Sequence, residues 1–107
     1  MNNTTEVKIY SFLGLAQRAG KLVSGDDSTM LDVKKNRVKL VLVAEDASNN
    51  TKKLFKDKTS FRNIACITYS TKLQLGLAIG KAPRAVMGIK DTNFANKILE
   101  LMENTKI

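Results

Sequence analysis

Residues 39–44, Lys39-Leu40-Val41-Leu42-Val43-Ala44, form a near-continuous run of leucine and β-branched side chains. A run of this length without polar alternation is typical of a strand that is covered on both faces. Residues 64–69 and 85–89 predict two further strands, whereas residues 21–25 suffice only for a brief strand or a loop. The middle of the chain therefore predicts a buried sheet that needs helices on both sides.

Helical spacing fills the intervals between these runs. Residues 5–19 carry apolar side chains three and four positions apart, and Gly20 follows as a stop signal. Each of the four later helices follows a residue that can cap its N-terminus: Asp26, Asp27 or Ser28; Asp46 or Ser48; Thr71, with Gln74 in capping-box spacing; and Asp91 or Thr92. The alternation predicts an α/β fold, a three-layer α-β-α sandwich with a central mixed sheet of about four strands and about five helices.

The charge balance points to a polyanionic partner. Among 107 residues, 18 Lys and Arg stand against 10 Asp and Glu, a formal net charge of +8. Such an excess favours phosphate contacts, so the partner could be RNA, DNA or an acidic membrane surface. The apolar runs are far shorter than the roughly 20 residues of a membrane helix, and residues 1–6 lack the features of a secretory signal. We expect one domain spanning 1–107, monomeric and cytoplasmic.

Catalytic and metal-binding chemistry find little support. The chain has no His and one Cys, which removes the commonest general base and every zinc pattern. Cys66 is interpreted as a buried filler in an apolar segment rather than a reactive thiol. The acidic pairs Asp26-Asp27 and Glu45-Asp46 could bind Mg²⁺, but each lies where a helix cap is expected. We therefore expect no enzyme, no cofactor and no metal site.

Two basic clusters and the aromatic residues are less decisive. The cluster of Lys34, Lys35, Arg37 and Lys39 suits a solvated helix end and a phosphate contact equally well. The cluster of Lys52, Lys53, Lys56 and Lys58 is interpreted as plain surface. The four phenylalanines fit core positions better than base-stacking positions: Phe12, Phe55, Phe61 and Phe94.

Three strings of residues occur in order and carry a resemblance: Leu22-Val23-Ser24-Gly25, Leu40-Val41-Leu42-Val43-Ala44-Glu45-Asp46-Ala47, and Leu75-Gly76 followed by Gly80. The set resembles the kink-turn RNA-binding ribosomal protein family of the archaeal and eukaryotic large subunit. The strings Leu13-Gly14-Leu15-Ala16-Gln17-Arg18-Ala19-Gly20-Lys21 and Phe94-Ala95-Asn96-Lys97 are similar to its small bacterial YlxQ-like branch. The resemblance covers nearly the whole chain and implies a protein that grips a sharply bent RNA stem with tandem sheared G·A pairs.

The resemblance also implies an RNA site made of two loops. The first is the glycine corner, Gly25, Asp26, Asp27 and Ser28, followed by Leu31, where the family carries Gly, any residue, Asn, Glu and then Lys. Asp27 can accept hydrogen bonds from guanine edges, whereas Leu31 cannot replace an ammonium group. The second is the proline loop, which follows Leu75 and Gly76: Lys81, Ala82, Pro83 and Arg84. Further basic residues are expected against phosphates: Lys21, Lys34, Lys35 and Lys72.

Three functions follow in order of preference. The first is an RNA-binding protein that recognises a kink-turn-type stem in ribosomal or regulatory RNA. The departures at Asp27, Ser28 and Leu31 leave a second, a ribosome-associated general RNA-binding module without kink-turn preference. The third is a small Mg-dependent nucleotide-handling enzyme that uses the acidic pairs.

Overall fold

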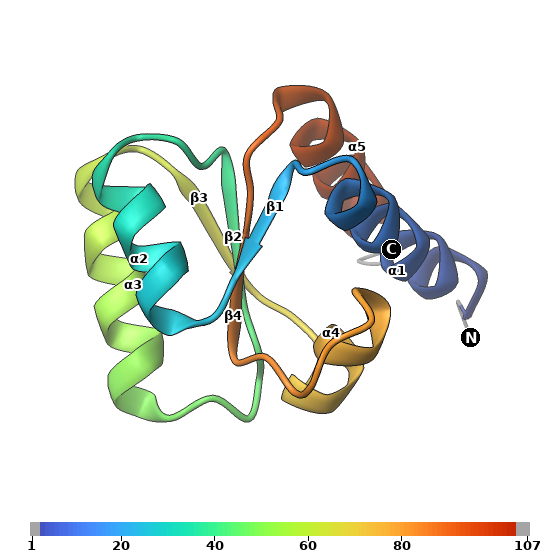
Figure 1. Cartoon of the computed structure of the whole chain (residues 1–107), viewed down its shortest axis with the longest axis horizontal. Coiled ribbons are helices and arrows are strands. Elements are labelled where there is room, and N and C mark those ends of the chain that lie inside the picture. Colours follow the sequence, from blue (N-terminus) through green and yellow to red (C-terminus); the bar gives the residue numbers. More distant parts are fainter. Residues whose placement is uncertain (1–2, 105–107) are drawn as a thin grey trace.

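The computed structural model describes residues 3–104, which are built around a four-stranded sheet in the order β1-β4-β2-β3 (Figure 1). The strands are β1 (Leu22–Ser24), β2 (Leu40–Val43), β3 (Ala65–Thr68) and β4 (Val86–Ile89). Strands β2 and β3 are parallel, whereas β4 runs antiparallel to β1 and β2. The last strand of the chain thus lies inside the sheet and joins the first strand to the rest.

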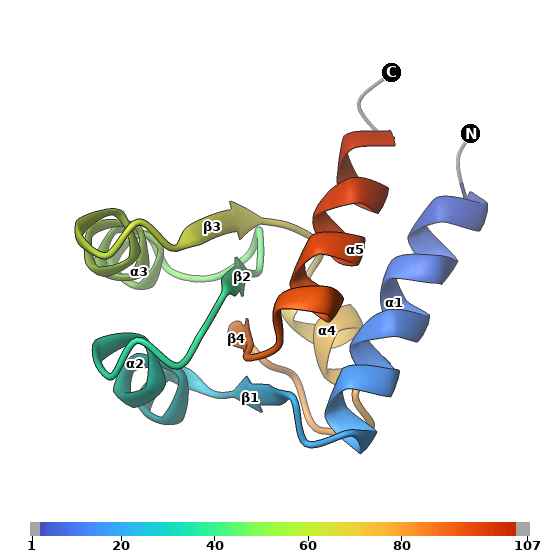
Figure 2. The ribbon, with the colours of Figure 1, turned by 90° about the horizontal axis from the view of Figure 1, so that it is seen from above.

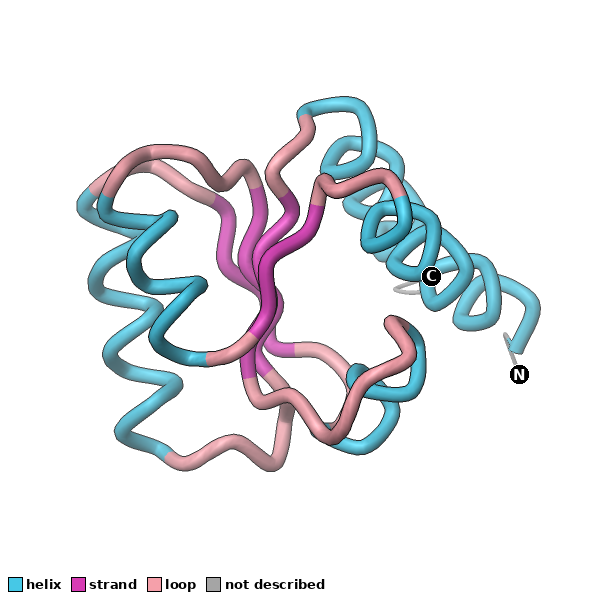
Figure 3. The backbone as a smooth tube through the Cα atoms, viewed as in Figure 1, coloured by secondary structure: helices cyan, strands magenta, loops and turns pink. Residues whose placement is uncertain are grey.

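Five helices cover the two faces of this sheet. Helices α2 (Asp26–Lys34) and α3 (Asn49–Phe61) lie on one face, and α1 (Asn3–Arg18), α4 (Lys72–Ala78) and α5 (Thr92–Asn104) lie on the other. Figures 2 and 3 show the three layers edge-on. The predicted α-β-α sandwich, with its mixed sheet, four strands and five helices, is confirmed. No helix within residues 3–104 has the length and apolarity needed to span a membrane.

The run that predicted the buried strand forms β2, whose four residues are all at most 1% exposed. Helix α1 contributes Ile9 and Leu13 from one layer, and α3 contributes Phe55 from the other; all three are buried. Burial of such side chains stabilises the fold by roughly 1.5–3 kcal/mol each. Coverage of β2 from both sides explains why its sequence has no polar alternation.

The helix caps confirm some predictions and correct others. Ser48 accepts a hydrogen bond from the Thr51 amide, and Thr71 accepts one from the Gln74 amide, as the capping patterns predict. Asp91 accepts one from the Phe94 amide. The prediction of a side-chain cap for α2 is wrong, because its cap position is Gly25 and no side chain bonds there.

Asp46 caps a different helix from the one predicted. Its Oδ1 accepts a 2.8 Å hydrogen bond from the backbone N–H of Lys72, at the start of α4 rather than α3. The acceptor satisfies one of the free N–H groups of that helix end and carries negative charge where the helix dipole favours it. A contact across 26 residues of sequence thereby ties the loop after β2 to the loop after β3.

The core prediction for the phenylalanines fails at one position. Phe55 is buried, and Phe12 and Phe94 pack edge to face at 6.5 Å. Phe61 is 83% exposed at the C-terminal end of α3. Cys66 is half-buried on the edge strand β3 rather than fully buried, and burial raises the pKa of its thiol, against smaller lowering effects of Thr59 and Lys56. A raised thiol pKa agrees with an unreactive side chain.

Candidate functional site

The glycine corner lies where β1 passes into α2. Gly25 has φ 95°, a left-handed value that favours glycine, and its N–H donates a 3.0 Å hydrogen bond to the carbonyl of Val86 on β4. Asp26, Asp27 and Ser28 follow in the first turn of α2, and all three are exposed. The corner therefore presents two carboxylates and a hydroxyl to solvent from a backbone that is fixed to the sheet.

The proline loop is fixed to α4 by close backbone contacts. The N–H of Lys81 donates to the carbonyl of Gly76, and the N–H of Arg84 donates to the carbonyl of Lys72, at 2.9 and 3.0 Å. Gly76 has no room for a side chain, since a Cβ there would overlap the carbonyl oxygen of Ala82. The loop reaches its position only because residue 76 is glycine.

The structure brings these two loops together. The Nε of Arg84 donates a 3.0 Å hydrogen bond to the Oγ of Ser24, the residue before the glycine corner. Ser24 also faces Met87 in the antiparallel pairing of β1 with β4. Exposed Lys81, Ala82 and Pro83 therefore lie beside the exposed residues of the glycine corner. Contact of these residues with RNA stays a prediction.

Ser24 was absent from the predicted site, although it holds Arg84 in place. The hydrogen bond joins residues that are 60 positions apart in the sequence. The only sequence signal was a hydroxyl at the end of a short strand, immediately before a glycine.

Leu75 and Gly76 support the site from below rather than form its surface. Leu75 is 0% exposed in the core, and Gly76 is buried against residues 81–82. By contrast Lys72 is exposed beside the loop, and Leu31 is 52% exposed on α2. Leu31 is therefore available for contact with a ligand, whereas Val33 of the same helix is fully buried.

Three predicted phosphate contacts lie away from the two loops. Lys21 precedes β1, and Lys34 and Lys35 lie at the C-terminal end of α2. Both elements meet at Gly25, so each lysine is at the far end of its element, about 13–15 Å from the corner along the axis of that element. In Figure 1 the start of β1 and the end of α2 lie at the opposite end of the sheet from α4. These lysines are close to the glycine corner in the sequence but not in the structure.

The charges at the two-loop end are nearly balanced. Residues 25–28, 45–48, 69–72 and 81–84 contain four carboxylates, Asp26, Asp27, Glu45 and Asp46, and three cations, Lys72, Lys81 and Arg84. Hydrogen bonds between these segments show that they adjoin, since Glu45 N–H donates to Ser70 O and Lys72 N–H to Asp46 Oδ1. This end combines carboxylate acceptors with a few cations, so it suits recognition of base edges better than neutralisation of many phosphates.

The acidic pairs do not form a metal centre in the part of the chain that the structure describes. Within residues 3–104 no group of three acidic, His or Cys side chains is arranged to hold a metal ion. Asp46 is engaged with the α4 N-terminus, and Asp26 and Asp27 lie in the first turn of α2. These positions have the helix-end role that charge and dipole alone would give them.

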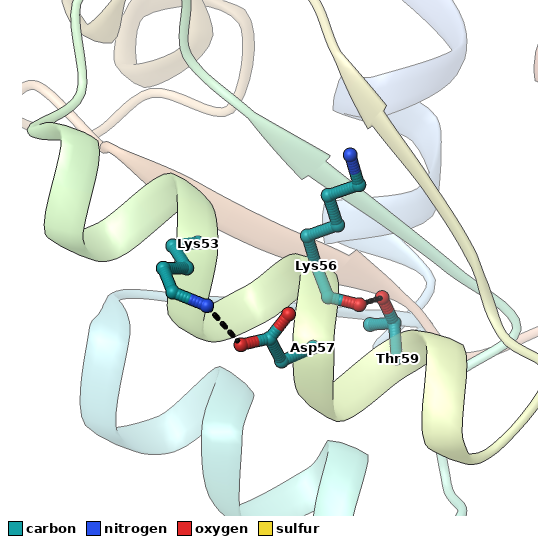
Figure 4. A network of polar contacts seen from close by, with 4 residues as sticks. All are labelled: Lys53, Lys56, Asp57 and Thr59. Carbon is teal, nitrogen blue, oxygen red and sulfur yellow. Dashed lines mark hydrogen bonds and ion pairs between the residues drawn. The ribbon is translucent and has the colours of Figure 1, made fainter.

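The lysines of α3 border a groove between that helix and the edge strand β3. Lys52, Lys53 and Lys56 line it together with Thr68 and Cys66, around a volume of about 560 Å³. Lys53 forms a 2.9 Å ion pair with Asp57 on the same helix (Figure 4). Lys53 and Lys56 are exposed, as the plain-surface interpretation expects, whereas Lys52 and Lys58 are half-buried.

Two curated proteins are similar to this chain over nearly its whole length. The chain is 44% identical to the "RNA-binding protein YlxQ" of Enterococcus faecium over 103 residues, covering 96% of this chain and 99% of that protein. It is 40% identical to the protein of the same name from Bacillus subtilis (strain 168), over 88% and 94% of the two chains.

Solved structures extend the comparison. A protein of unknown function from Bacillus halodurans superposes with a TM-score of 0.87 and 38% identity, covering 90% of this chain and 97% of the other. The Giardia lamblia 15.5kD RNA binding protein shares the fold with a TM-score of 0.78 at 15% identity, over 99% and 91% of the chains. The pattern of one family matches residues 7–99. The chain belongs to the ribosomal protein L7Ae/L30e/S12e/Gadd45 family.

Proposed function

We propose that this chain is a non-catalytic RNA-binding protein that recognises a kink-turn-type bent stem with its glycine corner and proline loop. Family membership and two relatives named as RNA-binding proteins support the RNA partner. The hydrogen bond from Arg84 to Ser24 carries the proposal for the site, because it holds two exposed loops together across one end of the sheet. We further propose that the RNA is ribosomal or regulatory, that the protein is a monomer and that it is cytoplasmic.

Each loop supplies a different kind of contact. The carboxylates of Asp26 and Asp27 accept hydrogen bonds from guanine N–H groups, which sheared G·A pairs leave within reach. Lys72 and Lys81 bind the phosphates, and Ala82 and Pro83 pack against an extruded base. The guanidinium of Arg84 uses its Nε for Ser24, and its Nη1 donates long hydrogen bonds to the carbonyls of Ala82 and Pro83. Its Nη2 is then the nitrogen that binds phosphate or base.

The test compares a kink-turn stem with a plain RNA duplex of equal length. We expect the bent stem to win the competition, and Arg84→Ala to weaken its binding about ten-fold, as loss of a charge-assisted hydrogen bond implies. Arg84→Lys keeps the charge but not the Nε donor and should fall between the two proteins. Lys8→Ala, which removes an exposed charge from α1, is the matched control and should bind almost as well as the original protein.

One observation favours a second candidate, a general RNA-binding module of the ribosome without kink-turn preference. Leu31 is exposed where the resemblance implies a lysine, so α2 offers an apolar side chain to the RNA. Equal competition by the bent stem and the plain duplex, with no effect of Arg84→Ala, would establish this candidate and refute kink-turn recognition.

A further inference from the structure

The end of α3 exposes an aromatic ring that packs against an arginine. Phe61, the last residue of the helix, is 83% exposed, and the guanidinium carbon of Arg62 lies 5.4 Å from the ring centroid. Arg62 is itself held by a hydrogen bond from Nη1 to the carbonyl of Lys58. A large apolar ring gains nothing for folding when it is left in water, whereas a flat ring beside a cation is a stacking surface for a nucleobase.

A hollow of about 210 Å³ is lined in part by Arg62, the residue that packs against this ring. It is bordered by Asn36, Val38, Lys39, Arg62, Asn63 and Ile64, from the turns that end α2 and α3. Asn36 and Asn63 are both left-handed, with φ 56° and 58°, and each turns the chain from its helix toward the next strand. The two turns therefore form one polar depression beside Phe61, with amide groups that can bond to base edges or to ribose.

This end of the molecule carries an excess of positive charge. Residues 34–39 and 61–64 contain five cations and no carboxylate: Lys34, Lys35, Arg37, Lys39 and Arg62. Asp32 lies nearby, but it is already within 3.4 Å of Lys90 and 3.9 Å of Arg37. Within residues 3–104 no ion pair is found for Lys34, Lys35 or Lys39, which are all exposed.

The depression is remote from the two-loop site. Strand β2 separates them, with Lys39 before it and Ala44 after it, about 16 Å along the strand. Figure 1 shows the turns after α2 and α3 at one end of the sheet and α4 with the proline loop at the other. A ligand at one end leaves the other end free.

We propose that the depression between residues 36–39 and 61–64 is a second RNA site, which binds a single-stranded segment. One base stacks on Phe61, the amides of Asn36 and Asn63 bond to its edge or ribose, and Lys39, Lys34 and Lys35 bind the phosphates that follow. The combination of a stacking ring with unpaired cations matches single strands better than duplexes, whose bases are already stacked. The protein then joins two RNA segments through opposite ends of its sheet, independently of what the two-loop site recognises.

The experiment measures binding of a fluorescent 12-nucleotide oligouridine by anisotropy at two salt concentrations. Phe61→Ala should weaken binding about five-fold or more, the lower end of the range for one base–aromatic stack, and Phe61→Tyr should restore it. Lys39→Ala should lower the slope of log affinity against log salt by about 0.7, the value for one phosphate of a single strand. Lys8→Ala on α1 and Arg84→Ala at the two-loop site are the controls and should leave oligouridine binding unchanged.

Several outcomes would overturn the proposal. Unchanged binding by Phe61→Ala, or equal losses for the alanine and tyrosine variants, would show that no base stacks there. Loss of oligouridine binding by Arg84→Ala alone would place single strands at the two-loop site. Displacement of the oligonucleotide by polyglutamate, with no effect of Phe61→Ala, would identify a surface for acidic proteins instead. A kink-turn result for Arg84→Ala tests the proposed function separately.

Discussion

Replacing Gly76 by alanine has two opposite effects on the free energy of unfolding, and the size of each is known. Gly76 lies within α4, where alanine is favoured over glycine by about 1 kcal/mol. The new Cβ would overlap the carbonyl oxygen of Ala82 and lie 2.9 Å from that of Lys81, both backbone atoms. Forcing a methyl group into such a contact costs about 1–3 kcal/mol, and backbone cannot rotate away as a side chain can. We expect the contact to win, with a net destabilisation of about 1 kcal/mol.

Thermal unfolding followed by circular dichroism measures this change. A loss of about 1 kcal/mol in a domain of this size lowers Tm by about 4–8 °C. Gly14→Ala is the matched control, since Gly14 is also a helical glycine but its Cβ would lie 3.0 Å from the carbonyl of Ala78, a contact that a small shift relieves. Its Tm should stay near that of the original protein.

The same variant should also weaken RNA binding at a temperature where it is fully folded. Relief of the overlap moves residues 81–82 away from α4 and strains the hydrogen bond from the N–H of Arg84 to the carbonyl of Lys72, which positions Arg84. A Gly76→Ala protein that is as stable as Gly14→Ala, or more stable than the original, would refute the close-contact reasoning. Unaltered kink-turn binding by a destabilised variant would refute the link between this contact and the site.

Three further substitutions or treatments have definite expected outcomes. Leu31→Lys should strengthen kink-turn binding and steepen the slope of log affinity against log salt by about 0.9. Leu31 is exposed, so its loss leaves the core intact. An unchanged slope in filter binding would place α2 away from phosphate. Thr29→Val should raise the free energy of unfolding, measured by urea titration, by about 1 kcal/mol. The reason is that Thr29 Oγ1 is buried without a hydrogen-bond partner among residues 3–104. A loss of stability would reveal a partner for the hydroxyl. Alkylation of Cys66 should be slow at neutral pH, because burial raises the pKa of its thiol. The rate should reach half its maximum at a pH above the ordinary thiol pKa. A midpoint below that pKa would contradict the burial argument.

The sequence predicted the elements well where the pattern was local. The run at residues 39–44 identified β2, and hydroxyl or carboxylate caps correctly marked the starts of α3, α4 and α5 at Ser48, Thr71 and Asp91. Each of these signals depends on residues only a few positions apart, so it can be recognised in the sequence without knowledge of the fold. Asp46 capped an unexpected helix because its partner is 26 residues away.

Helix phase explains the error at Phe61. Six residues after Phe55, at about 100° per residue, a side chain points about 120° away from the buried stripe. Thr59 lies about 40° from Phe55 and is 1% exposed. Helical spacing therefore places Phe61 outside the core, although its hydrophobicity alone favours burial.

The candidate site was predictable only through the resemblance. No local pattern shows that Arg84 meets Ser24, since their contact depends on the antiparallel pairing of β1 with β4. The direction of an element was equally hidden: Lys21, Lys34 and Lys35 are close to Gly25 along the chain, yet β1 and α2 extend away from it toward the opposite end. Even β1, with three residues, is long enough to separate Lys21 from Gly25.

The central place of β4 has a consequence for synthesis on the ribosome. Strand β1 pairs with β4 alone, and the amide of Gly25 bonds to Val86, so a nascent chain that ends before residue 86 has neither contact. The glycine corner and the proline loop can meet only after about four-fifths of the polypeptide has been made, because the strand that joins them is encoded last among the four. The proposed RNA site is therefore absent from incomplete translation products, and it forms in the same step that completes the sheet.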